Sequence, residues 1–142
     1  MKAQAKVLFE GQVKGEAMVL EDWLSFGGGL DPESGKIVDQ HHPQAGERVT
    51  GKVVVLPGIR GSAGSPSTLA ESIRLGTGPC GIILGEAETS ALAAAFAAKE
   101  LYAIDVPVVV LAREGYDALE TGQLVEIDET GHVATTDDTD GE

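Results

Sequence analysis

The chain has 142 residues, which is long enough for one domain with its own hydrophobic core. Its 23 acidic and 10 basic residues give a formal net charge of −13, which disfavours nucleic acid as the main partner because phosphates would be repelled. No segment approaches the roughly 18 apolar residues of a membrane span, and no signal peptide is evident, so we expect a cytoplasmic protein without a membrane partner.

Glycines divide the first part of the chain into short strands and turns. The apolar runs Val7–Phe9 and Ala17–Leu20 are predicted strands, bounded by Gly11 and Gly15. A long loop is predicted over residues 25–48, which contain three consecutive glycines, an Asp-Pro and a Ser-Gly pair. A loop of this length is uncommon in a compact domain unless it has a function.

The second half alternates between buried strands and helices. Three apolar runs, Lys52–Leu56, Gly81–Leu84 and Val106–Leu111, have the pattern of fully buried strands. One helix is predicted to open at Ser65, with this serine as the N-cap and a proline in the first turn. The segment Glu88–Tyr102, rich in Ala, Leu, Glu and Lys, is the second helix.

A short helix near Glu114–Thr121 and a hairpin of Leu124–Ile127 with His132–Thr135 complete the predicted fold. The strand–helix–strand–helix–strand order requires right-handed crossovers and a parallel sheet, to which the glycine-rich first half adds an antiparallel or barrel-like layer. We therefore predict an α/β domain with three β/β/α layers over residues 1–134. The acidic tail 135–142 has no apolar residue to bury and is predicted to be disordered.

The most informative motif is PGIRGSAGSP at residues 57–66, between a predicted strand and a predicted helix. Ligands of α/β proteins collect at the carboxyl ends of strands, and glycines beside a helix N-terminus favour an anion. Ser62 is a candidate base if Arg60 and the helix N-terminus stabilise its alkoxide. The alternative is a strand-to-helix turn capped by Ser65 and without chemistry. The predicted substrate-binding residues are Arg60, Gly61, Gly64 and Ser65.

Two similar motifs are rejected. Residues 46–52 match the first seven positions of a P-loop, but Val53 stands where Ser or Thr would bind magnesium, and a strand follows instead of a helix. A nucleophile elbow needs glycine two residues before its serine, and Arg60 occupies that position relative to Ser62. Nucleotide binding and an α/β-hydrolase are therefore disfavoured.

The adjacent histidines His41 and His42 are candidates for metal binding or proton transfer. Neighbouring side chains point in different directions and no third ligand is evident, so hydrogen bonding within the loop or contact with a partner is favoured. The single cysteine, Cys80, cannot form an internal disulfide or hold an iron–sulfur cluster or zinc ion alone. No metal site is predicted within this chain.

The segment SFGGGLDP at residues 25–32 contains three consecutive glycines, which let backbone amides approach a carboxylate or a partner surface. The alternative is a flexible turn followed by an Asp-Pro turn. With the two histidines, Ser25, Gly27 and Gly28 are assigned to a loop that faces the site or a partner.

Four motifs in this order and spacing, SFGGGLDP, GKIVDQHHP, GKVVVLP and RGSAGS, resemble the aconitase X small subunit, or swivel domain, from about Gly11 to Leu111. The resemblance implies the swivelling β/β/α domain of aconitases and a hydro-lyase active only with a large subunit. That subunit would hold the iron–sulfur cluster, of the 4Fe-4S type, on its own cysteines. Ser62 would be the proton-abstracting base, because Ala63 replaces the second serine often found in the family motif.

The resemblance also implies two substrates, both small hydroxy acids. We expect dehydration of (R)-5-phosphomevalonate to trans-anhydromevalonate 5-phosphate in an archaeal-type mevalonate (isoprenoid) pathway, since the separate small chain and its acidity favour that enzyme. The alternatives are the small subunit of cis-3-hydroxy-L-proline dehydratase and a non-catalytic binding module. A metal hydrolase using His41 and His42 is a third hypothesis.

Overall fold

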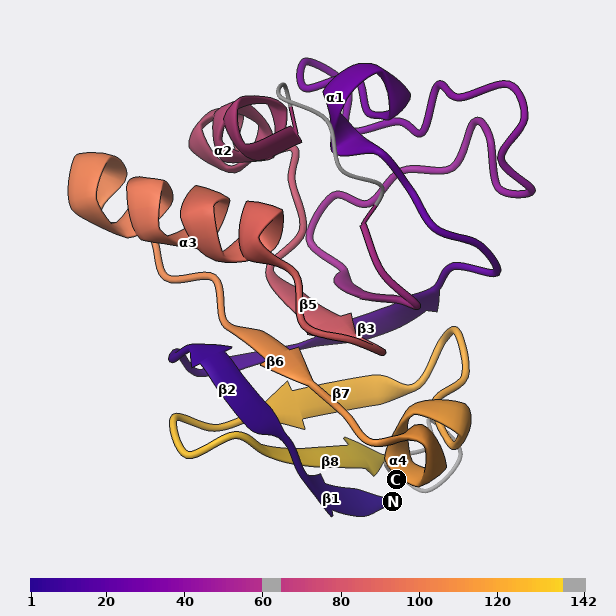
Figure 1. The fold of residues 1–142 in the computed structure, drawn as a ribbon, viewed down its shortest axis with the longest axis vertical. Helices are drawn as coiled ribbons and strands as arrows, with labels where there is room; N and C mark the ends of the chain where they lie inside the picture. Colours follow the sequence, from indigo (N-terminus) through magenta and orange to yellow (C-terminus); the bar gives the residue numbers. More distant parts are fainter. Residues whose placement is uncertain (60–64, 137–142) are drawn as a thin grey trace.

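The computed structural model describes residues 1–59 and 65–136, which form eight strands and four helices (Figure 1). None of the helices in these two ranges is both long and apolar enough to cross a bilayer. In chain order the elements are β1 (Lys2–Gln4), β2 (Lys6–Phe9), β3 (Val13–Val19), α1 (Phe26–Gly29), β4 (Val53–Leu56), α2 (Ser65–Leu75), β5 (Gly81–Leu84), α3 (Thr89–Tyr102), β6 (Val108–Val110), α4 (Arg113–Asp117), β7 (Leu124–Ile127) and β8 (His132–Thr136).

All eight strands belong to one curled sheet with the order β1-β8-β7-β3-β4-β5-β6-β2. Strands β3, β4, β5 and β6 are parallel neighbours, and the other pairings are antiparallel. The two strands at the ends of this order, β1 and β2, are consecutive in the chain and separated only by Ala5, whose N–H donates to the Gly131 carbonyl at 2.9 Å. One extended segment therefore supplies both ends of the sheet, so that the sheet curls toward closure and protects its edges.

The buried strands β4, β5 and β6 separate two hydrophobic cores, because successive side chains of a strand point to opposite faces. The helix side, covered by α2 and α3, receives Val54, Leu56, Ile82, Leu84 and Val108. The opposite side, covered by the antiparallel strands β7 and β8, receives Val53, Val55, Ile83 and Val109. Burial on both faces explains why these strands are apolar without alternation, and it confirms the predicted three-layer α/β fold.

The boundary predicted at Gly15 is wrong, since β3 runs through this residue from Val13 to Val19. A Cβ at position 15 would lie 2.9 Å from Cys80 Sγ, so glycine is needed here for close packing and not for a turn. The predicted strands also omitted β1. The second predicted helix and the final hairpin are confirmed as α3 and as the β7–β8 pair.

The predicted loop over residues 25–48 is packed against the helix-side core instead of projecting from it. Its apolar residues Phe26, Leu30 and Ile37 are each at most 3% exposed, and α1 is one irregular turn within it. Isolated bridges of Leu30 with Ile37 and of Lys36 with Arg48 fold the loop back on itself. It is therefore a compact loop with a hydrophobic anchor, a form that often carries function.

The predicted acidic tail overlaps the last strand. Strand β8 continues to Thr136 and so includes the first two residues of the range 135–142. Residues 137–142 lie outside the described part of the chain.

Candidate functional site

The carboxyl ends of β4, β5 and β6 meet at one edge of the sheet. Leu56, Leu84 and Val110 are register partners across these parallel strands. Two further hydrogen bonds extend the pairing, from Gly85 N–H to the Leu56 carbonyl at 3.1 Å and from Leu111 N–H to the Leu84 carbonyl at 3.0 Å. This is the edge at which α/β proteins bind ligands.

Most residues of the predicted RGSAGS site lie outside the described part of the chain, namely Arg60, Gly61, Ser62 and Gly64. The described residues on either side of the segment are well placed for a site. Ile59 follows the carboxyl end of β4 and is 2% exposed, and it forms a parallel bridge with Leu24. Ser65 is the first residue of α2, so the helix begins where the sequence predicted it within one residue.

The structure brings the glycine turn of α1 to this edge. Leu24 forms a bridge with Ile59, three residues after the end of β4, and Ser25 is the next residue after Leu24. The turn packs against α2 (Figure 1), and within it the Ser25 hydroxyl donates to the Gly27 carbonyl at 3.1 Å. Gly28 has a φ of +93° with open space around it, so glycine is required there for the backbone conformation.

The two histidines have different environments. His42 is 6% exposed; its Nδ1 accepts from the Gln44 backbone N–H at 3.0 Å, and its Nε2 donates to the Asp22 carbonyl at 3.3 Å. These partners require the proton on Nε2 and a free lone pair on Nδ1. His41 is exposed, and its backbone N–H donates to Asp39 Oδ1 at 3.0 Å. For His42, the predicted hydrogen bonding within the loop is confirmed.

Residues 1–59 and 65–136 contain no group of three or more His, Cys, Asp or Glu side chains arranged to hold a metal ion. The one cysteine of the chain, Cys80, packs beneath Gly15, and its thiol donates to the Gly51 carbonyl at 3.4 Å. Burial raises the pKa of this thiol above its ordinary value, which disfavours the thiolate that an iron–sulfur cluster needs. A single, partly buried thiol does not fit the ligand set of a cluster.

Trp23 was not among the predicted site residues, and it lies at this edge, beside residues that follow β4, β5 and β6. Its indole packs against Gly58: a Cβ at position 58 would lie 2.5–2.8 Å from three ring carbons. The side chain is also 37% exposed, because its outer part borders a pocket of about 300 Å³. The walls of the pocket include Trp23, Pro57, Gly85, Glu86, Arg113 and Tyr116.

The polar groups of this pocket come from the chain that follows β5 and β6. Arg113 Nε lies 3.5 Å from Asp117 Oδ2, and both side chains are largely exposed. The Tyr116 hydroxyl is buried and has no hydrogen-bond partner among the described residues, and burial raises the pKa of Tyr116 to about 12. These residues could have been predicted from the sequence. Ligands of α/β proteins bind at the carboxyl ends of parallel strands, and this applies to the residues after β5 and β6 as well as to Pro57 after β4.

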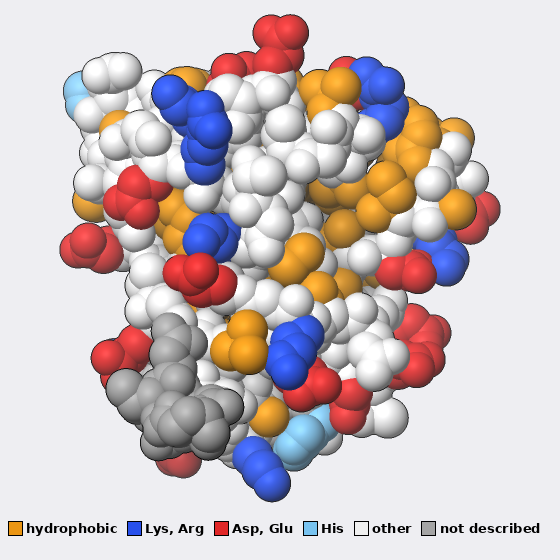
Figure 2. Space-filling view, turned by 180° about the vertical axis from the view of Figure 1, so that it is seen from behind, with side chains coloured by type: hydrophobic (Ala, Val, Ile, Leu, Met, Phe, Trp, Pro, Cys, Tyr) orange, Lys and Arg blue, Asp and Glu red, His pale blue; other side chains and the backbone are white. Residues whose placement is uncertain are grey.

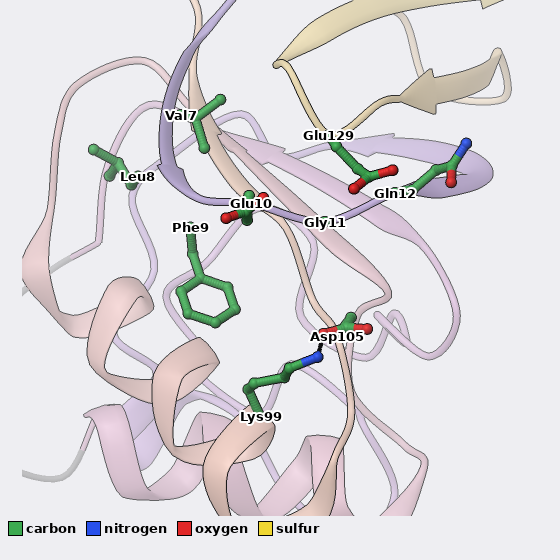
Figure 3. A pocket seen from close by; sticks show the side chains of 9 residues that line it. All are labelled: Val7, Leu8, Phe9, Glu10, Gly11, Gln12, Lys99, Asp105 and Glu129. Carbon is green, nitrogen blue, oxygen red and sulfur yellow. Dashed lines mark ion pairs between the residues drawn. The ribbon is translucent and has the colours of Figure 1, made fainter.

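A larger hollow, of about 770 Å³, lies at the amino end of β6, between the β2–β3 turn and α3 (Figure 3). Lys99 from α3 reaches Asp105 with an Nζ–Oδ1 distance of 2.7 Å, and this hydrogen bond raises the pKa of Lys99. Glu10 and Glu129 add further carboxylates. Because its one lysine is paired and its other charges are negative, this hollow suits an anionic substrate poorly.

The family model for the aconitase X swivel domain matches residues 2–135. The chain belongs to the aconitase X swivel-domain family. This match confirms the family resemblance drawn from the four motifs, and it spans every described element from β1 to most of β8.

Relatives and solved structures agree with this membership. The phosphomevalonate dehydratase small subunit of Thermococcus kodakarensis is 32% identical over 141 residues, 97% of this chain and 98% of that protein. Its counterpart in Methanopyrus kandleri is 43% identical over 62% of this chain and 65% of that protein. The crystal structure of Thermococcus kodakaraensis aconitase X (holo-form) superposes with a TM-score of 0.85 at 30% identity, covering 96% of this chain and 99% of that one.

Other relatives are much longer than this chain. The cis-3-hydroxy-L-proline dehydratase of Pseudomonas aeruginosa is 36% identical over 114 residues, which are 80% of this chain but 20% of that protein. The chain therefore spans about a fifth of that relative and about two thirds of the one from Methanopyrus.

Proposed function

We propose that this aconitase X swivel domain is the small subunit of a heteromeric hydro-lyase, and that Ser62 removes a carbon-bound proton from a hydroxy acid held by a larger subunit. The observation that supports this most is the family match across residues 2–135, which includes the RGSAGS motif between β4 and α2. The motif follows the carboxyl end of a parallel strand, where such sites form.

We propose (R)-5-phosphomevalonate as the substrate and trans-anhydromevalonate 5-phosphate as the product. The support is that the Thermococcus relative named as a phosphomevalonate dehydratase small subunit corresponds to this chain over almost its whole length. The second candidate is cis-3-hydroxy-L-proline, supported by the 36% identity to the longer Pseudomonas dehydratase.

The residues of this chain suit the base side of a dehydration. The reaction needs a group that removes the proton from carbon and a group that assists the departing hydroxide, and together they leave a double bond and water. The N-terminus of α2, an 11-residue helix, carries a partial positive charge that favours an anion. With Arg60 in the same motif, this charge would lower the cost of an ionised Ser62 or of an anionic substrate group.

The group that assists the departing hydroxide is assigned to the partner. This chain has one cysteine, and its thiol is partly buried against Gly15, so we propose that the iron–sulfur cluster is bound by the cysteines of the larger subunit. A cluster bound there would supply a Lewis acid. Exposed apolar side chains support the existence of a partner. Figure 2 shows apolar side chains gathered over the helix layer. Helices α2 and α3 carry four apolar side chains that are each at least 40% exposed, Leu75, Phe96, Leu101 and Tyr102.

The test is reconstitution with the larger, cysteine-containing subunit and assay with both candidate substrates. Ser62→Ala should lower kcat by about 100-fold to 10,000-fold, the usual contribution of a general base, while the complex still assembles. Ser67→Ala, at an exposed position in the first turns of α2, is the matched control and should stay within twofold of wild type. A fully active Ser62→Ala complex would refute the base assignment, and turnover of hydroxyproline alone would replace the proposed substrate.

A further inference from the structure

Trp23 is the only tryptophan of the chain, and its indole lies against the backbone of Gly58. The ring carbons Cζ3, Cε3 and Cη2 come within 2.5–2.8 Å of the position that a Cβ of residue 58 would occupy. Real Cβ atoms essentially never approach other atoms so closely, so this contact exists only because residue 58 is glycine.

The backbone that carries Trp23 is anchored by hydrogen bonds. Its N–H donates to Asp22 Oδ1 at 2.8 Å, and the Asp22 carbonyl accepts from the buried His42 ring at 3.3 Å. The same ring accepts from the Gln44 N–H, and the Gln44 side chain donates to the Val19 carbonyl at 2.8 Å. His42 and Gln44 of the compact loop thus hold Val19, the last residue of β3, and Asp22, the residue directly before Trp23.

The residues after β4 are enclosed between two neighbours. On one side, Trp23 covers Gly58 and the next residue, Leu24, pairs with Ile59. On the other side Gly85 lies so close that its Cβ, if present, would be 3.0 Å from the Pro57 carbonyl oxygen. The contact at Gly58 depends on the absence of a side chain, and the one at Gly85 leaves little room for one, so residues 57–59 are packed closely on both sides.

We propose that Trp23 is a positioning residue, whose indole holds the backbone of Gly58 and thereby fixes residues 57–59, from which residues 60–64 continue. This inference rests on the proposed function for the role of Ser62, which lies in that segment. Without the indole, one face of Gly58 loses its packing, and glycine is the residue with the greatest backbone freedom. A displacement of about 1 Å at a catalytic group can lower the rate about 100-fold.

The kinetic test uses the reconstituted complex. Trp23→Ala should lower kcat about 10-fold to 100-fold with little change in KM, because the reacting group is displaced while substrate binding by the larger subunit remains. Trp23→Phe, whose smaller aromatic ring keeps part of the packing volume, should restore part of this loss. Val38→Ala, an exposed apolar side chain in the compact loop, is the control and should keep wild-type kcat. An unchanged kcat in Trp23→Ala would overturn the inference.

A double-mutant cycle tests the contact itself. Gly58→Ala places a methyl group inside the indole contact and should be impaired alone. In Trp23→Ala/Gly58→Ala the methyl group occupies space that the indole has left, so the second substitution should cost at least threefold less kcat than it does in wild type. Independent, multiplicative effects would refute the positioning role.

A measurement without activity separates this inference from the proposed function. In hydrogen exchange of the full chain, Trp23→Ala should speed exchange in peptides that cover residues 57–59 and leave the β7–β8 hairpin unchanged. Unchanged exchange at 57–59 would overturn the positioning role, whatever the activity. If Ser62→Ala proves fully active while Trp23→Ala still shows faster exchange at residues 57–59, the assignment of Ser62 as the base fails but the role of Trp23 in holding Gly58 stands.

Discussion

Gly35→Ala tests how the compact loop is fastened to the rest of the domain. Gly35 is buried and has a φ of +75°. Its N–H donates to the Asp31 carbonyl at 2.8 Å, and its carbonyl accepts from the Val49 N–H at 2.9 Å. A Cβ added here would collide with the Thr50 hydroxyl and the Thr77 carbonyl oxygen. Those two groups are hydrogen-bonded to each other at 2.7 Å, so the new methyl group would separate the loop from the chain that follows α2.

Three costs contribute to the expected loss of stability. A left-handed backbone costs an alanine about 1–2 kcal/mol, and insertion of a methyl group into a packed site costs about 1–3 kcal/mol. Loss of the Thr50–Thr77 hydrogen bond adds about 0.5–1.5 kcal/mol. Gly51→Ala is a matched control, because its φ of +69° is similar and a Cβ there would meet nothing within 4 Å. The control should lose only the backbone contribution, so Gly35→Ala should be less stable than Gly51→Ala by about 2–4 kcal/mol.

The free energy of unfolding of both variants is measured by equilibrium unfolding in urea. Equal m-values would show that the two variants expose the same surface on unfolding. The expected result is a clearly lower midpoint for Gly35→Ala than for Gly51→Ala. If the two variants lose the same free energy of unfolding, the packing of the loop against Thr50 and Thr77 contributes nothing and the reasoning is refuted.

Three further outcomes are expected. Tyr116→Phe should be neutral or stabilising by up to about 1 kcal/mol, because the buried hydroxyl has no partner among the described residues; a marked loss of stability would show that a partner exists. Cys80 should react with iodoacetamide at pH 8 much more slowly than a free thiol and should become reactive in urea, since burial raises its pKa; equal rates in the folded chain would contradict this. Hydrogen bonds from the Thr130 side chain and from the backbone N–H groups of His132 and Thr130 lower the pKa of Asp128 below its ordinary value of 3.8. The ionised carboxylate therefore stabilises the folded state above pH 3.8, and this stabilisation is lost as the pH falls through the lower folded-state pKa. The free energy of unfolding of Asp128→Ala should therefore lie below that of wild type at pH 7, and the difference should shrink as the pH falls through the folded-state pKa of Asp128; a gap that is independent of pH would contradict the assignment.

The elements that the sequence predicted well are those specified by local patterns. The apolar runs at 53–56 and 81–84 become β4 and β5, because strands buried on both faces leave no polar position. Helix α3 lies within one residue of its prediction, since its alanines and leucines favour helix and four of the alanines form its buried face. The four ordered motifs also identified the family, which the match over residues 2–135 confirms.

Contacts between distant parts of the chain required the tertiary structure. The role of Gly15 depends on Cys80, and the contact of Trp23 with Gly58 joins two segments 35 positions apart. The curling of the sheet depends on β1 and β2, which lie at its two ends and pair with β8 and β6. A pattern along the chain records the preference of each residue for helix, strand or burial, but it does not specify which distant surface completes that burial. The packing of the whole domain decides this, and it is what places Trp23 against Gly58.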